Sequence, residues 1–313
     1  MTTGIAVKWR SGAASDGGLV RGENQDRCYI DDERGVFLVV DGLGGHAAGE
    51  KAAESAVDAI RSELEKRAGE DAAVRVRAAI SAANNHICDL AEENPDWTGM
   101  ACVLTLAVMD GERVVIGHVG DSRLYLIWNG AIRKLTADHS PVGELEDRGE
   151  LSERDAMSHP RRHEVFRNVG SHRRTADEEE FIEIKEFLMK PDAAFLLCSD
   201  GLSDQLASRE ILDLIERYDG DPGAVARELV EAANRAGGMD NVTAIFVAGS
   251  EFIGAESPAM AEARVRHSIT RPRVVEPPKK AGFGARLFRI LTCRTAFLFY
   301  GFVLGVALAL VWR

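Results

Sequence analysis

Residues Val39–Glu50, VVDGLGGHAAGE, form the stretch that decides how the rest of the sequence is interpreted. An apolar run at Gly35–Val40 predicts a buried strand that leads directly into Asp41. A carboxylate at the end of a buried strand is costly to desolvate unless a positive charge lies beside it. Gly42 lets the backbone bend so that its carbonyl faces the same point, and these two oxygens suit a hard cation. An Asp-Gly pair is also typical of a plain turn, so the stretch alone leaves both interpretations open.

Four more aspartates lie beside predicted apolar strands. They are Asp26 in RGENQD, Asp121 in HVGDS, Asp200 in CSDG and Asp240 in GGMDN. Each alone is typical of an exposed turn or a helix cap. In a closed sheet such strand ends could converge, and several carboxylates in one place require cations between them.

Carboxylates without a partnering His or Cys favour Mg²⁺ or Mn²⁺ over zinc. Two such ions can bind a bridging water, lower its pKa and direct it at a phosphoryl group. Arg21 fits this chemistry, because a guanidinium group pairs bidentately with phosphate oxygens. A surface ion pair is an equally good explanation of Arg21 from its spacing.

Charge and cysteine content narrow the class of protein. Residues 255–313 contain ten Lys or Arg and three acids, a net charge of +7. Because the whole chain has a net charge of −12, residues 1–254 carry a net charge of −19. Such an acidic body argues against nucleic-acid binding. The five cysteines show no metal-binding spacing, and four of them lie within predicted strands or helices, which indicates reduced core residues of a cytosolic domain. The N-terminus has no apolar signal-peptide region.

Turn signals and periodicity predict an antiparallel sheet with helices, and not a doubly wound parallel sheet. Two helices follow His46, with apolar faces at Ala48–Leu64 and Val76–Leu90. Asp110-Gly111 and Asn129-Gly130 predict tight hairpins. Two short strand pieces are expected within residues 5–31, around a link at Ser11–Gly22. The remaining strands are expected at Val103–Met109, Val114–Val119, Leu124–Trp128, Ile132–Leu135, Phe181–Phe187, Ala193–Cys198 and Asn241–Ala248, with a helix capped by Asp221 before the last.

Residues 137–180 predict an irregular excursion from the sheet, since they are polar and poorly periodic. The histidines at 118, 139, 159, 163 and 172 share no ligand spacing and are expected to be structural or solvent-facing. A basic cluster contains Arg161, Arg162, Arg167, Arg173 and Arg174. It is either a solvated surface with acidic neighbours or a binding surface for acidic or phosphorylated substrates.

The C-terminal part predicts a membrane anchor. The composition of residues 251–290 is that of a flexible linker that ends in a basic juxtamembrane segment. Thr295–Trp312 contains no charge, and as a helix it would span about 27 Å, enough for a bilayer core. Five Lys or Arg at 279–294 precede it and only Arg313 follows, which places the large domain in the cytoplasm. A buried C-terminal helix is the alternative.

The sequence resembles the PPM-type metal-dependent protein serine/threonine phosphatases of type 2C, in their bacterial form. The resemblance covers residues 5–248 and rests on six matches in order. These are RGENQD (21–26), VVDGLGGHAAGE (39–50), HVGDSRLYLI (118–127), LTADHS (135–140), LLCSDGLSD (196–204) and GGMDNVTAIFV (237–247).

The resemblance implies an α+β fold, an α-β-β-α sandwich of two antiparallel sheets flanked by helix pairs. It implies that Asp41 bridges two Mn²⁺ or Mg²⁺ ions, and that Gly42 offers its carbonyl to one of them. Asp200 and Asp240 would complete the other, and Asp121 with Asp200 a third, weaker site. Asp26 would hold metal-bound water and Arg21 the substrate phosphate. The excursion at 137–180 would be the flap, which contributes to substrate choice.

Leu43 is a departure from the eukaryotic pattern, in which a histidine proposed as general acid follows the Asp-Gly pair. Bacterial members commonly carry Met or Leu there. The identity of the general acid is therefore open, and a metal-bound water is one source of the proton. His46 comes three residues later, where local packing or helix capping is the expected role.

We therefore expect hydrolysis of phosphoserine and phosphothreonine on proteins by a water bridged between two divalent metals. The alternatives are an inactive phosphoprotein-binding module of the same fold and a hydrolase of small phosphate esters. The expected domains are a phosphatase domain at 1–250, a linker at 251–290 and a transmembrane helix at 291–313. Membrane-associated Ser/Thr kinases or their substrates are the expected partners.

Overall fold

Two five-stranded sheets form the centre of the chain in the computed structural model, which describes residues 9–254 except 45, 176–177 and 179. The strands are β1 Trp9–Asp16, β2 Asp26–Asp31, β3 Val36–Leu43, β4 Ala101–Asp110, β5 Arg113–Val119, β6 Arg123–Trp128, β7 Ala131–Lys134, β8 Glu183–Leu188, β9 Ala194–Cys198 and β10 Val242–Gly249.

The strand order is β1-β10-β9-β6-β7 in one sheet and β2-β3-β4-β5-β8 in the other. Every pair of neighbouring strands is antiparallel. The predicted hairpins are present, and Asn129 and Gly130 both adopt the positive φ that their tight turn requires. The antiparallel arrangement predicted from the turn chemistry is therefore confirmed.

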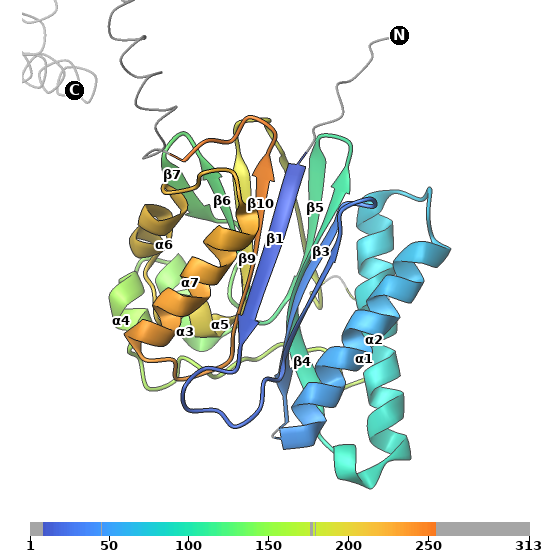
Figure 1. Cartoon of the computed structure of the whole chain (residues 1–313). Coiled ribbons are helices and arrows are strands. Elements are labelled where there is room, and N and C mark those ends of the chain that lie inside the picture. The colour runs from blue at the N-terminus through green and yellow to red at the C-terminus, as the bar shows by residue number, and fades with distance from the viewer. Residues whose placement is uncertain (1–8, 45, 176–177, 179, 255–313) are drawn as a thin grey trace, which may run out of the picture. The chain divides into compact units, whose positions relative to one another are not determined.

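Helices cover the outer face of each sheet. Helices α1 (His46–Lys66) and α2 (Ala72–Glu93) pack on the sheet that contains β3, and a short 3₁₀ turn, Pro95–Trp97, follows α2. Helices α5 (Asp200–Ser203), α6 (Ser208–Ile215) and α7 (Pro222–Ala236) accompany the other sheet. Figure 1 shows the resulting order of layers, with helices outside and the two sheets inside. This is the predicted α-β-β-α sandwich.

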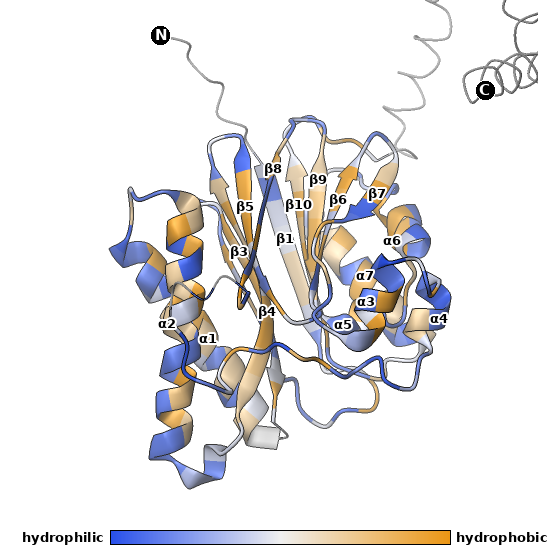
Figure 2. Cartoon of the chain, turned by 180° about the vertical axis from the view of Figure 1, so that it is seen from behind, coloured by the Kyte–Doolittle hydropathy of each residue, from blue (hydrophilic) through white to orange (hydrophobic). Residues whose placement is uncertain are grey.

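Alternation along β3 explains how one strand serves two hydrophobic layers. Val36, Leu38 and Val40 pack against α1 and α2, whereas Phe37 and Val39 point between the two sheets. All five are at most 2% exposed, and burial of each such side chain contributes roughly 1.5–3 kcal/mol. Figure 2 shows mainly hydrophobic colours on the strands and polar colours on the outer helix surfaces. The near-continuous apolar strands thus reflect cover on both faces.

The predicted link at Ser11–Gly22 is wrong in its first half, because residues 11–16 continue β1 and pair with β10. Small residues hid this strand from the sequence pattern. They are required by packing, since a Cβ at Gly12 would lie 2.3 Å from the backbone nitrogen of Gly223 at the start of α7. The predicted cap of α7 is confirmed, because Asp221 accepts a hydrogen bond from that same nitrogen.

The excursion at 137–180 contains two short helices that were not predicted, α3 (Pro141–Asp147) and α4 (Glu153–Met157). Ser140 and Ser152 cap them through their hydroxyl groups. A buried ion cluster anchors α3 to β6, since Arg123 contacts Asp138 at 2.6 Å and Glu146 at 2.9 Å. Helix α6 was also missed, although its buried face is apolar.

The C-terminal predictions lie outside the described residues. This holds for the stretch Thr295–Trp312 and for nearly all of the predicted linker, so the domain boundaries stay predictions. Within the part of the chain that the structure describes, no helix has the length and apolar character needed to cross a bilayer. The four cysteines of that part are free thiols, as expected for reduced core residues.

Candidate functional site

Asp26 on β2 lies opposite Asp41 on β3 in the antiparallel register. The alternation of β3 places Asp41 on the same face as Phe37 and Val39, which is the face between the sheets. Cys28 shares that face on β2, two residues after Asp26. The two carboxylates therefore lie at the edge of the inter-sheet layer, where the apolar packing ends.

Asp26 is nearly inaccessible, with 2% of its surface exposed. Ser199 donates a hydrogen bond to its Oδ2 at 2.7 Å, and the backbone nitrogen of Thr243 donates to the same Ser199 hydroxyl. Burial raises the pKa of Asp26 to about 7, against the effect of the Ser199 and Thr243 hydrogen bonds. Its Oδ1 is buried and has no hydrogen-bond partner in the described structure.

The glycines of the opening stretch allow α1 to start against β3. A Cβ at Gly42 would lie 2.1 Å from the carbonyl oxygen of Gly49, in the first turn of α1, and 3.0 Å from that of Gln25. Gly44 adopts φ +122°, which residues with a Cβ rarely reach. Only glycine at position 42 permits this approach, which explains why Gly42 follows the aspartate.

A second close contact joins the two later motifs. Asp200 is the first residue of α5, directly after β9, and Asp240 precedes β10. A Cβ at Gly201 would lie 2.0 Å from the carbonyl oxygen of Asn241, so glycine is again required. The motifs CSDG and MDN thus pack backbone against backbone, and this brings their aspartates to the same end of the sheet.

One cavity of about 440 Å³ brings six of the seven predicted site residues together. Asp26 is the exception, since it is buried and lies opposite Asp41 in the β2–β3 register. The predicted residues that line the cavity are Arg21, Asp41, Gly42, Asp121, Asp200 and Asp240. The convergence of strand-end aspartates that the sequence suggested is therefore present in the structure.

These carboxylates fit divalent cations with oxygen ligands. Burial raises the pKa of Asp41 well above its ordinary value, and the neighbouring Asp26 and Asp200 raise it further. Burial and Asp200 do the same to Asp121. The Oδ1 of Asp200 is buried without a hydrogen-bond partner in the described residues, as is that of Asp26. Hard cations such as Mg²⁺ or Mn²⁺ would bind the carboxylates that line the cavity, Asp200 among them, and offset the repulsion.

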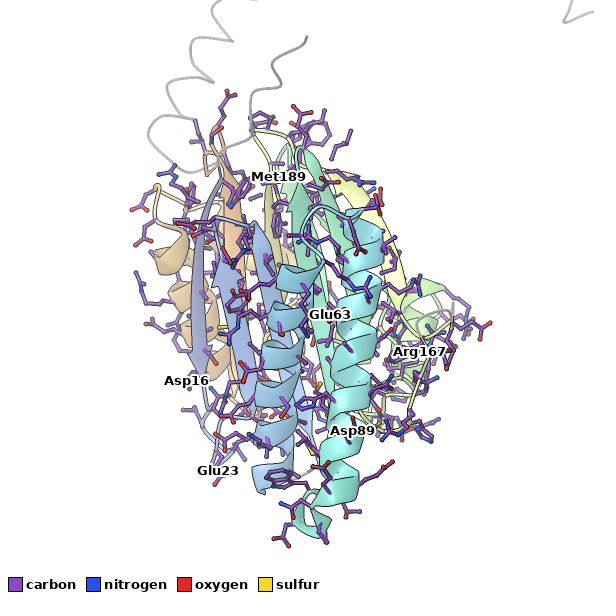
Figure 3. The ribbon with its side chains drawn as sticks, turned by 90° about the vertical axis from the view of Figure 1, so that its right-hand side faces the viewer. Asp16, Glu23, Glu63, Asp89, Arg167 and Met189 are labelled. Atoms are coloured by element: carbon purple, nitrogen blue, oxygen red, sulfur yellow. The ribbon has the colours of Figure 1, made fainter. Side chains whose placement is uncertain are left out.

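Arg21 pairs with Asp240, whose Oδ2 lies 2.7 Å from its guanidinium group, while 56% of the arginine side chain is exposed. Both interpretations of Arg21 thus have support, because the ion pair lies at the cavity itself. Asn241, which the sequence analysis did not single out, holds the loop that carries Arg21. It accepts a hydrogen bond from the backbone nitrogen of Gln25 and donates to the carbonyls of Gly17 and Glu23. Figure 3 labels Glu23 on this loop.

His163 is exposed to solvent, as expected, but it also lies at the cavity, which the sequence did not indicate. It lines the cavity together with Val165, and its Nδ1 lies 3.7 Å from Asp200 Oδ2 and 3.6 Å from Asp204 Oδ2. Burial and the neighbouring Asp200 raise the pKa of Asp204 to about 7. Ligand atoms of these three residues lie within 4.8 Å of one another, near enough to share a cation. In the sequence, this cluster is indicated only by Asp204, the second aspartate of SDGLSD (199–204).

His118 and His139 are structural, as expected. The Nδ1 of His118 lies 2.9 Å from the Thr105 hydroxyl, and its Nε2 lies 2.9 Å from the carbonyl oxygen of Gly120. Burial lowers the pKa of His118 to about 4, so that it is neutral at pH 7 and accepts from Thr105. His139 accepts a hydrogen bond from the backbone nitrogen of Gly120. Glu183 lies near both rings, but their nitrogens already have partners.

Several arginines of the basic cluster have acidic partners. Arg161 pairs with Glu164, Arg173 with Asp89 and Glu92, and Arg174 with Glu178, which supports the solvated-surface interpretation for these three. Arg162 pairs with Asp204 in a contact that is largely shielded from solvent. Arg167 instead lies over the ring of Phe166, 5.8 Å from its centroid.

Comparison with known proteins gives consistent matches. Residues 20–220 match the family described as Protein phosphatase 2C. The chain is 34% identical over 241 residues to the serine/threonine protein phosphatase PstP of Mycobacterium tuberculosis, covering 77% of this chain and 45% of PstP. It is 35% identical over 242 residues to the serine/threonine phosphatase stp of Listeria welshimeri, covering 74% of this chain and 93% of that protein. The chain thus spans about half the length of PstP.

Solved structures agree with the fold. The crystal structure of the M. tuberculosis phosphatase PstP/Ppp superposes with a TM-score of 0.69 at 34% identity, covering 77% of this chain and 98% of that one. The catalytic domain of PstP in complex with two manganese ions gives a TM-score of 0.68 at 32% identity, with the same coverage.

Proposed function

We propose, from the premise that the chain belongs to the protein phosphatase 2C family, that it hydrolyses phosphoserine and phosphothreonine on proteins with Mn²⁺ or Mg²⁺. The observation that carries the proposal is the cavity in which Arg21 meets the carboxylates of Asp41, Asp121, Asp200 and Asp240. The resemblance of the motifs and the two manganese ions of the related PstP domain support it.

The residues that would hold the metals follow from the motif matches. Asp41 would bridge two ions, and the Gly42 carbonyl would face one of them. Asp200 and Asp240 would complete the other, and Asp121 with Asp200 would hold a third, weaker one. Bound there, the ions would supply a water of lowered pKa, placed for attack on phosphorus.

The chain's own residues then bind and orient the reactants. Arg21 binds the phosphate, because its guanidinium lines the cavity and is largely exposed beside Asp240. The free Oδ1 of Asp26 accepts a hydrogen bond from the attacking water, while Ser199 fixes the other carboxylate oxygen. As water attacks, the bond from phosphorus to the seryl or threonyl oxygen breaks without a covalent enzyme intermediate. Leu43 lines the cavity and has no ionisable group, so we assign the proton for the leaving oxygen to water.

Steady-state rates on phosphopeptides and on small phosphate metabolites, with Mn²⁺, test this function. We expect phosphopeptides to be the better substrates by kcat/KM. Preference for metabolites would instead identify a small phosphate-ester hydrolase. A protein that binds phosphopeptides but hydrolyses nothing with Mn²⁺ or Mg²⁺ would be the inactive binding module.

We also propose that the chain is a single-pass membrane protein with its phosphatase domain in the cytoplasm. The uncharged stretch Thr295–Trp312 and the basic residues before it support the proposal. A tether to one membrane would raise the effective concentration toward membrane-associated Ser/Thr kinases or their substrates. These proteins are the partners that we propose.

A further inference from the structure

Residues 163–175, the inner flap segment, carry His163 and Val165 to the cavity. The segment contains no helix, and its one β-bridge joins Val169 to Cys102 at the start of β4. Backbone groups without regular pairing need other partners if a segment is to keep one position. Side-chain contacts must therefore fix this segment.

Two asparagines of α2 hold the backbone of the inner flap segment. Asn84 accepts a hydrogen bond from the Gly170 nitrogen at 2.8 Å and donates one to the His172 carbonyl at 2.7 Å. Asn85 accepts from the Arg174 nitrogen and donates to the Arg174 carbonyl, both at 2.9 Å. The two side-chain amides thus make hydrogen bonds to backbone N–H and C=O groups that a neighbouring β-strand would otherwise make.

The surroundings of Gly170 show that the contact is closely fitted. Gly170 adopts φ +108°, and a Cβ there would lie 2.3 Å from Cγ2 of Ile87 on α2. The Cys88 thiol donates to the Gly170 carbonyl at 3.0 Å. Arg173 adds ion pairs to Asp89 and Glu92. Figure 3 shows the segment that carries Arg167 beside α2, on which Asp89 is labelled.

Asn84 is an unusual residue for its place. It is fully buried within a helix whose inner face is otherwise mainly Ala and Ile, and a buried amide is costly unless all its hydrogen bonds are made. Its oxygen accepts one hydrogen bond, and its nitrogen donates to His172 and to Asn85. An apolar residue would serve α2 equally well, so the amide serves the inner flap segment.

The asparagines also connect the segment to the metal-binding side of the fold. Helix α2 shares a hydrophobic core with β3, which carries Asp41. At the other end of the segment, Arg162 pairs with Asp204 at 2.9 Å, directly after α5, which carries Asp200. The inner flap segment is therefore fixed to both halves of the sandwich that supply the cavity.

We propose that Asn84 and Asn85 are positioning residues that hold the inner flap segment at the cavity and so determine how well a phosphopeptide binds. The inference rests on the proposed phosphatase function. A phosphopeptide extends beyond the phosphate to the flap, whereas p-nitrophenyl phosphate needs only Arg21 and the carboxylates. Misplacement of the segment therefore impairs the peptide reaction selectively.

The test uses the full chain with Mn²⁺ and the variants Asn84→Ala and Asn85→Ala. Ser81→Ala is the matched control, since Ser81 is buried on the same helix and its hydroxyl has no hydrogen-bond partner in the described residues. Hydrogen exchange should accelerate in residues 163–174 of both asparagine variants while β3 and β9 stay protected. KM for a phosphopeptide should rise about tenfold or more, with kcat and the p-nitrophenyl phosphate reaction within about twofold of the unmodified protein.

Three results would overturn the proposal. Unchanged exchange in residues 163–174 would show that the asparagines do not hold the segment. Faster exchange with unchanged peptide KM would show that its position does not matter for binding. Equal losses on both substrates would indicate a merely structural role.

Asn85→Ala keeps the test decisive should Asn84→Ala fail to fold, because Asn85 is only partly buried. If the unmodified protein cleaved p-nitrophenyl phosphate but no phosphopeptide, the proposed function would fail. The hydrogen-exchange result would still decide whether Asn84 and Asn85 hold the inner flap segment in place.

Discussion

Asp26 and Asp41 face each other across the β2–β3 pair, on the face that lies between the two sheets. Like charges opposite one another in an antiparallel pair are destabilising, and burial strengthens the effect. The pKa of each is raised, first by burial and further by neighbouring carboxylates. The metal-free fold therefore carries an electrostatic cost at this edge that bound cations would remove.

Asp41→Asn should consequently stabilise the metal-free protein and abolish its response to metal. In EDTA near pH 7 we expect the free energy of unfolding to rise by about 1–3 kcal/mol, because asparagine replaces a carboxyl group whose ionised form the fold disfavours. Mn²⁺ at a hundredfold excess over its Kd should stabilise the unmodified protein by about 3 kcal/mol but leave the variant nearly unchanged. Thermal unfolding with and without Mn²⁺ measures both effects.

Asp110→Asn is the control for this measurement, since Asp110 is exposed and lies at the opposite end of β4 from the cavity. Its variant should keep the full stabilisation by Mn²⁺. Equal stabilisation of the Asp41→Asn protein by Mn²⁺ would show that Asp41 is not a ligand.

Arg21→Ala should raise KM for p-nitrophenyl phosphate by roughly tenfold or more, because the guanidinium group supplies charged hydrogen bonds to phosphate. Arg21→Lys should recover only part of the loss, since an ammonium group cannot pair bidentately. Arg10→Ala is a suitable control, because Arg10 is an exposed residue on β1 whose guanidinium donates to the Gly220 carbonyl. An unchanged KM in Arg21→Ala would remove Arg21 from the phosphate site.

His118 predicts a specific loss of stability in acid. Its pKa is about 4 in the folded protein, lowered first by burial, against 6.5 as the ordinary value. A lowered histidine pKa means that the folded state favours the neutral ring, so stability is full above pH 6.5 and falls as pH drops towards 4. Between pH 7 and about 4.5 this group alone should cost about 2–3 kcal/mol.

His118→Gln removes the titration, so its free energy of unfolding should fall less steeply over that range. Urea unfolding at several pH values measures the two slopes, and the difference between them isolates His118 from the carboxylates. Parallel curves for the two proteins would mean that His118 is not held neutral.

The sequence predicted well which carboxylates meet at the cavity, because each follows or precedes an apolar run, and such runs end at a sheet edge. This local pattern was sufficient to predict Asp41, Asp200 and Asp240 as residues of the site. The pairing of Asp26 with Asp41 depends on the register of two strands, and the contact of Ser199 with Asp26 joins residues 173 positions apart. Neither follows from local periodicity.

The flap was the part that the sequence predicted least. His163 reaches the cavity because Arg162 pairs with Asp204 and because Asn84 and Asn85 fix residues 170–174. These are single side-chain contacts between distant segments, with no periodic signal in residues 137–180. Strand β1 was partly missed for a different reason, since close packing of α7 selects small residues such as Gly12 where a strand usually carries large ones.

Deletion of residues 281–313 should move the protein from the membrane fraction to the soluble fraction. The stretch Thr295–Trp312 would otherwise place an uncharged segment of about bilayer length in the membrane. Activity on p-nitrophenyl phosphate should survive, because the cavity residues all precede residue 250. Fractionation of cells that express the full and the shortened chain measures this. Sedimentation of the shortened chain with membranes would contradict the anchor.

The central claim is that the aspartates at the sheet edge hold the metal ions on which hydrolysis depends. Its most direct test is the turnover of p-nitrophenyl phosphate by the EDTA-treated protein after addition of Mn²⁺, compared with Asp240→Asn and with Asp58→Asn, an exposed acid on α1. We predict that Mn²⁺ restores turnover in the unmodified protein and in Asp58→Asn, and that Asp240→Asn stays at least about a hundredfold slower. Full turnover by Asp240→Asn, or by the unmodified protein in EDTA, would contradict the account.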